Sequence, residues 1–119
     1  MTVLHFPDAV DQHHKWLEKL SAALRGEGVE LVDHEVVCDD KCYIGRWIYG
    51  DGVAFEDLPE FQMVKKIHKN LHHIAGQAWI EKHNGTLSDP ETYLNKIKEA
   101  GHDLFMSWNQ LNDQIGALD

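Results

Sequence analysis

The chain has 119 residues, of which 43% are hydrophobic and 26% charged, and this composition is typical of one soluble globular domain. Its formal net charge of −9 disfavours nucleic acids and anionic membranes as partners, since both attract Lys and Arg. No apolar run reaches the roughly 20 residues of a membrane span and the N-terminus does not resemble a secretory signal, so we expect a single cytoplasmic domain over residues 1–119.

The first predicted helix begins near Asp8, which follows Pro7 and can cap it, and ends before Gly26. Its apolar positions recur every three or four residues, as on the buried face of a packed helix: Val10, His13, Leu17, Leu20 and Leu24. His13 therefore occupies a core position. His14 lies about 100° further round the helix and is expected to face outward.

A loop is expected over residues 27–38, because this stretch has no helical period. A short helix follows, with Asp39 or Asp40 as its cap and Gly50 at its end. This helix holds Cys42, Ile44, Trp47 and Ile48.

The third predicted helix runs from Pro59 to the Asn84-Gly85 pair, with Asp57 as a plausible cap and proline in the first turn. The residues on its expected buried face are Val64, His68, Leu71, Ala75 and Ala78.

The last helix is expected to begin at Ser88-Asp89-Pro90-Glu91, where Ser88 and Glu91 match a capping box. Apolar residues then keep a heptad spacing from Leu94 to Leu118. This long seam, with Gly101 allowing close helix approach, predicts a homodimer; the alternative is that the stripe faces the protein's own core. We therefore expect an all-α fold, an antiparallel four-helix bundle with an additional short helix that carries the cysteine ligand.

Histidine is the unusual component of the composition, with nine residues in the chain. His68 and His72 lie four apart on a predicted helix, so both imidazoles can point at one metal ion. His13, at a core position, needs partners for both ring nitrogens, and a metal with a hydrogen-bond acceptor would supply them. The alternatives are a chance pair of histidines and a core histidine hydrogen-bonded to its neighbours.

Cys42 stands at the start of the short helix, where free backbone amides favour a thiolate, although a free cysteine is more often a small buried apolar residue. With His13, His68 and His72 it forms a set of three nitrogens and one sulfur, which zinc accepts as a tetrahedron. Magnesium and calcium prefer oxygen. Four protein ligands leave no position for a catalytic water, so we expect no enzymatic activity.

The motifs HxxW, CxxGRW and HxxxH follow one another in the stretches AVDQHHKWL, CYIGRWIYG and PEFQMVKKIHKNLHHIAG. In this order they resemble the chemoreceptor zinc-binding (CZB) domain. The resemblance implies a dimeric helical bundle that binds zinc through His13, Cys42, His68 and His72. It also implies a role in bacterial signal transduction, in which such domains regulate chemotaxis receptors or cyclic-di-GMP enzymes in response to zinc or to oxidants acting on the cysteine.

No receptor coiled coil or cyclase domain is present in these 119 residues, so we expect the partner to act in trans or to belong to a longer chain. One alternative is a hemerythrin-like di-iron bundle, but Cys38 follows His34 and Ser107 follows His102 where that family has carboxylates. Another is a purely structural, zinc-stapled dimerisation module.

Cys38, four residues before Cys42, is not explained by the resemblance. One alternative is that it replaces His13 in a two-cysteine site, and another is that it acts as a resolving thiol for an oxidised Cys42. We expect instead that Cys38 is not a zinc ligand in the resting state.

Overall fold

A computed structural model of the chain describes residues 6–27, 36–40 and 42–118. All the regular secondary structure in these ranges is helical, which confirms the all-α class. The elements are α1 (Phe6–Leu24), α3 (Tyr43–Tyr49), the 3₁₀ helix η1 (Asp51–Phe55), α4 (Pro59–Asn84) and α5 (Pro90–Leu118). No helix in the described ranges is both long enough and apolar enough to cross a membrane.

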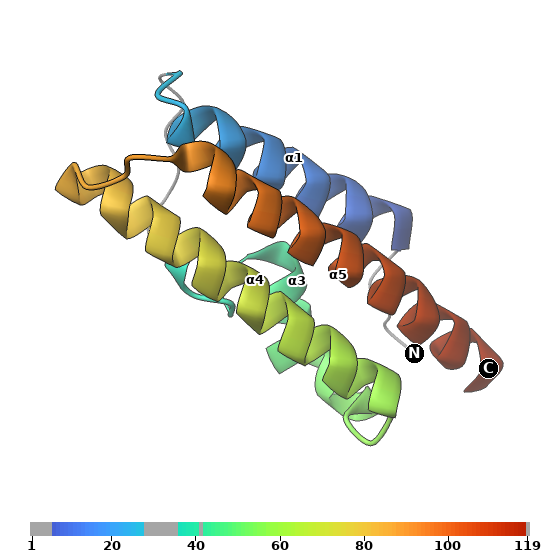
Figure 1. The fold of residues 1–119 in the computed structure, drawn as a ribbon. Helices are drawn as coiled ribbons and strands as arrows, with labels where there is room; N and C mark the ends of the chain where they lie inside the picture. Colours follow the sequence, from blue (N-terminus) through green and yellow to red (C-terminus); the bar gives the residue numbers. More distant parts are fainter. Residues whose placement is uncertain (1–5, 28–35, 41, 119) are drawn as a thin grey trace.

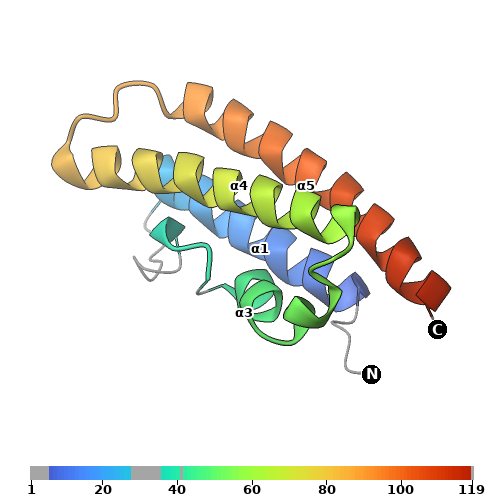
Figure 2. The ribbon, with the colours of Figure 1, turned by 90° about the horizontal axis from the view of Figure 1, so that it is seen from below.

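The three long helices lie side by side, as Figure 1 shows. Helices α4 and α5 form an antiparallel hairpin, and α1 runs antiparallel to α5 on its other side. The short α3 and η1 lie together below this layer, next to α1 (Figure 2). The described residues thus provide three long helices and a short one, and the four-helix bundle stays a prediction.

The ends of α4 lie where the sequence places them. Pro59 occupies the first helical position, and Gly85 ends the helix in the left-handed conformation, with φ of 74°. The prediction that Asp57 caps this helix is wrong: Leu58 occupies the cap position and makes no side-chain hydrogen bond to the helix. Proline at the first position has no amide hydrogen, and the Phe61 amide nitrogen donates to the Leu58 carbonyl oxygen at 3.0 Å, so a backbone group takes the place of a side-chain cap.

Two other expected caps are also wrong. Helix α1 begins at Phe6, which places Asp8 inside its first turn. At α5, Asp89 is the cap, since the Thr92 amide nitrogen lies 3.4 Å from its Oδ1. Glu91, the other expected partner of the capping box, instead accepts a hydrogen bond from Arg25 Nε at 3.1 Å. Glu91 thus forms an ion pair with the residue that follows α1, and not a capping bond within α5.

The apolar stripe of α5 is buried in the chain's own core. Its buried members are Leu94, Ile97, Leu104, Trp108, Leu111 and Ile115. A Cβ atom on Gly101 would lie 3.0 Å from Leu17 Cδ1, so this glycine lets α1 approach α5 within one chain. The stripe therefore serves the protein's own core, as the alternative reading held, and does not itself support a homodimer.

Candidate metal centre

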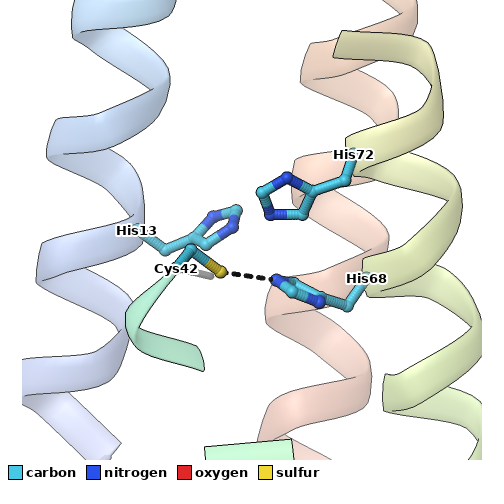
Figure 3. Close-up of side chains that lie close together, drawn as sticks. All are labelled: His13, Cys42, His68 and His72. Carbon is cyan, nitrogen blue, oxygen red and sulfur yellow. Dashed lines mark hydrogen bonds between the residues drawn. The ribbon is translucent and has the colours of Figure 1, made fainter. Parts of the chain in front are cut away.

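Four side chains from three elements converge at one place, as Figure 3 shows. His13 comes from α1, Cys42 from the start of α3, and His68 and His72 from α4. One ligand atom of each lies within 4.8 Å of the others. A tetrahedral zinc ion, with bonds of about 2.0–2.3 Å, holds its ligand atoms about 3.3–3.8 Å apart. The group would need only a small contraction to enclose the ion.

The HxxxH pair behaves as its spacing predicts. His68 and His72 are both fully buried, on the face of α4 that includes Val64, Leu71 and Ala75. Their ring centroids lie 4.5 Å apart. His13, also buried, faces them from α1, with its centroid 5.6 Å from that of His68.

His72 is held in one tautomer. Its Nδ1 atom lies 3.0 Å from the carbonyl oxygen of Val36, and a carbonyl can only accept a hydrogen bond. Nδ1 therefore carries the proton, and Nε2 keeps a free lone pair directed into the cluster. Metal-binding histidines commonly use this arrangement, with one nitrogen on the metal and the other donating to a carbonyl or carboxylate.

The cluster contains nitrogen atoms that the protein itself does not satisfy. His13 Nε2 and His72 Nε2 are buried and have no hydrogen-bond partner. An unsatisfied buried polar atom costs about 1–3 kcal/mol, so such atoms call for an explanation. His68 Nε2 lies 3.1 Å from Cys42 Sγ, a hydrogen-bond contact that a shared zinc ion would replace, with the two atoms slightly further apart. The residues therefore fit zinc.

Burial keeps the histidines in their neutral form. It lowers the pKa of His13 to about 3 and that of His68 to about 2, and neighbouring histidines act in the same direction. The pKa of His72 is also lowered by burial, against the opposing effect of its bond to Val36. At neutral pH all three rings are uncharged, so their lone pairs are available to a metal.

Cys42 is itself the cap of α3. Its Sγ accepts a hydrogen bond from the Gly45 amide nitrogen at 3.3 Å, so the expectation that Asp39 or Asp40 caps this helix is wrong. Burial raises the pKa of the partly buried thiol to about 11, while the Gly45 amide acts in the opposite direction. A metal that binds here must displace the thiol proton.

Trp16 forms one wall of the cluster. Its ring centroid lies 4.8 Å from that of His72 and 5.2 Å from that of His13. The indole is partly buried and thus adds an apolar surface beside two candidate ligands. The HxxW spacing marks this residue, and the CxxGRW motif includes Gly45, whereas the Val36 carbonyl is a backbone group that no motif marks.

The remaining candidates lie outside the cluster. Cys38 is a free, partly buried cysteine and is not a member of the group. His14 is exposed, as expected, and its Nε2 lies 3.1 Å from Glu18 Oε1. His102 is also exposed, and His34 lies outside the described residues. The group holds a thiol and no carboxylate, which differs from the bridging carboxylates of a hemerythrin-like di-iron site.

Comparison with known families gives a match to the chemoreceptor zinc-binding domain over residues 13–79. This range is more than half of the chain and contains all four clustered residues. No curated protein and no solved structure gives a significant match. On the family match and the cluster that it spans, the chain belongs to the chemoreceptor zinc-binding domain family.

Proposed function

We propose that the protein is a sensory or regulatory domain that holds one Zn²⁺ through His13, Cys42, His68 and His72. The observation that carries this proposal is the convergence of three neutral imidazoles and one sulfur from three elements. Zinc suits this donor set, whereas calcium and magnesium take oxygen ligands.

Zinc in this position would join α1, the start of α3 and α4. These segments are far apart in the sequence, so the bound ion would stabilise the native arrangement that brings them together. Four protein ligands also complete the tetrahedron and leave no position for a catalytic water, which supports a regulatory role over an enzymatic one.

The proposed signal is a change in zinc occupancy, caused by the zinc concentration or by oxidation of Cys42. Cys42 is the one thiol among the four candidate ligands. Peroxide converts a thiolate to a sulfenic acid, with hydroxide as the other product, and the thiolate charge that holds zinc is lost. The proposed setting is the bacterial cytoplasm, with a chemotaxis receptor or a cyclic-di-GMP enzyme as the regulated partner.

A homodimer remains part of the proposal, now on a surface that α5 shares with α1. A groove of about 910 Å³ lies between α1 and α5. Its lining includes the apolar residues Leu17, Leu94, Ile97, Leu104, Phe105 and Trp108. Most of these residues are already buried within the chain, but Phe105 is 42% exposed and Leu17 is partly exposed. A helix from a second copy placed in this groove would cover Phe105 and Leu17 and complete an arrangement of four long helices.

Elemental analysis of the purified protein tests the proposal. We expect about one zinc per chain, and removal of zinc by a chelator should lower the melting temperature. Two irons per chain with a visible absorption band would instead support an oxygen carrier. A protein that loses zinc with no change in oligomeric state or partner binding would be a structural module.

A further inference from the structure

The segment that leads to Cys42 lies directly on one face of α3. Gly45 and Tyr49 are four residues apart and therefore share this face. A Cβ atom on Gly45 would lie 1.8 Å from the carbonyl oxygen of Asp39, so the contact requires glycine. The backbone at Asp39 is thus in direct contact with the helix that Cys42 caps.

A side-chain hydrogen bond holds the same residue. The Tyr49 hydroxyl donates to Asp39 Oδ2 at 2.5 Å. The Tyr49 ring, in turn, lies beneath Lys65 Nζ, which is 5.0 Å from the ring centroid, a geometry typical of a cation–π contact. Tyr49 therefore connects the segment before Cys42 with α3 and with α4, the helix that carries His68 and His72.

The segment that leads to Cys42 is attached to α3 at two places, Asp39 and Cys42 itself. Three residues before it, Asp39 is held by the contact with Gly45 and by the hydroxyl of Tyr49. At Cys42 itself, the sulfur accepts the Gly45 amide at the beginning of the helix. These contacts at Asp39 and Cys42 accompany a sulfur position 3.1 Å from His68 Nε2.

Asp39 also influences the cluster through its charge. Burial is the main influence on the pKa values of Cys42 and His72, and the negative charge of Asp39 adds a smaller upward contribution to each. A carboxylate that approached the sulfur more closely would repel the thiolate. The Tyr49 hydroxyl holds this carboxylate by its hydrogen bond to Oδ2.

We propose that Tyr49 is a positioning residue of the metal centre, which holds Asp39 against α3 and thereby keeps Cys42 Sγ in its metal-binding position. The proposal rests on the proposed zinc site. Tyr49 does not touch the ion. It sets how readily the sulfur leaves the ion, and therefore how readily zinc is released.

Tyr49→Phe tests this proposal, because it removes only the hydroxyl. Tyr93→Phe is a matched control: the Tyr93 hydroxyl hydrogen-bonds Glu81 and does not belong to the cluster. Each variant is loaded with Co²⁺, whose thiolate-to-metal absorption band reports the sulfur bond, and with Zn²⁺ for transfer to a chelator. We expect Tyr49→Phe to weaken the cobalt–thiolate band and to release zinc about fivefold faster, the equivalent of one lost hydrogen bond. Tyr93→Phe should match wild type in both measurements.

A second pair of variants tests whether Tyr49 acts through Asp39. Asp39→Ala should also speed zinc release, and the double variant with Tyr49→Phe should be no faster than the faster single variant. Additive effects, or a Tyr49→Phe variant that behaves like Tyr93→Phe, would overturn the proposal. A wild-type protein that binds neither cobalt nor zinc would instead contradict the zinc site itself.

Discussion

His72 Nδ1 lies 3.0 Å from the carbonyl oxygen of Val36, and this bond directs the unpartnered Nε2 of His72 into the cluster. Val36 precedes Cys42 by six residues, so one short stretch of chain both orients a histidine and supplies the sulfur. The orientation of one ligand and the position of another thus depend on the same segment.

Loss of a clustered histidine should remove zinc and lower stability. His68→Ala should weaken zinc binding by more than about 100-fold, since even partners that only orient ligands contribute 10–100-fold. The melting temperature of the zinc-loaded protein should fall with it. His73→Ala is the control, because His73 is exposed on the same helix. Equal zinc content in the two variants, measured by elemental analysis, would count against the site.

Oxidation should act through Cys42. Hypochlorous acid or peroxide should release zinc from the wild-type protein, because oxidation removes the thiolate ligand. Cys42→Ser, loaded with zinc at a concentration high enough to fill its weaker site, should show no added release. A colorimetric zinc indicator follows the reaction. The redox role fails if both proteins lose zinc at the same rate under oxidant.

Two variants distinguish the proposed ligand set, which includes His13, from the alternative set, in which Cys38 replaces His13. Cys38→Ala should keep full zinc occupancy, since Cys38 lies outside the clustered group. His13→Ala should lose much of its zinc, because the buried Nε2 of His13 faces the other ligands. The reverse pattern of occupancies would favour a Cys₂His₂ site without His13.

The metal-free protein should lose stability in mild acid. The ordinary histidine pKa is 6.5, whereas burial lowers the pKa of folded His13 to about 3 and of His68 to about 2. Between these values the unfolded chain binds more protons than the folded one. The stabilisation is complete above about pH 6.5 and falls as the pH decreases, by about 1.4 kcal/mol per pH unit for each histidine.

Urea unfolding of the metal-free protein from pH 7.5 to pH 4.5 measures this slope. His68→Ala should reduce this slope by the contribution of one histidine, about 1.4 kcal/mol per pH unit. A free energy of unfolding that does not change across this range would show that the histidines are not buried in neutral form.

Self-association should depend on the α1–α5 groove. Phe105 and Met106 are neighbours on α5 with similar exposure, 42% and 47%, but only Phe105 lines the groove. Phe105→Glu should therefore dissociate a dimer that Met106→Glu leaves intact. Light scattering measures the mass, and a wild-type value near one chain, 13.7 kDa, would contradict the homodimer.

Much of the fold follows from local sequence signals. Pro59 and Gly85 bound α4 where their backbone preferences place them, and the three- and four-residue spacing identifies the buried faces. The predictions that Asp57 caps α4 and that Ser88 caps α5 are wrong, because several residues near a helix start can serve as caps. The partner that Glu91 finds, Arg25, lies 66 residues away, and no local pattern indicates it.

The sequence alone identifies the four clustered residues, since each is a potential ligand at a position that its motif marks. It does not identify the groups that hold these four side chains in place. The Val36 carbonyl, the close contact of Asp39 with Gly45, and the Tyr49 hydrogen bond depend on how the chain passes over α3 and α4. These contacts involve backbone atoms, or side chains that no motif links to each other, so the sequence alone does not predict them.

X-ray absorption at the zinc edge tests the central claim most directly, because it counts the sulfur and nitrogen atoms around the ion. We predict one sulfur at about 2.3 Å and three nitrogens at about 2.0–2.1 Å in the wild-type protein. In Cys42→Ser the sulfur shell should disappear, while in Cys38→Ala it should remain. Two sulfur ligands in the wild-type protein, or none, would contradict a centre built from His13, Cys42, His68 and His72.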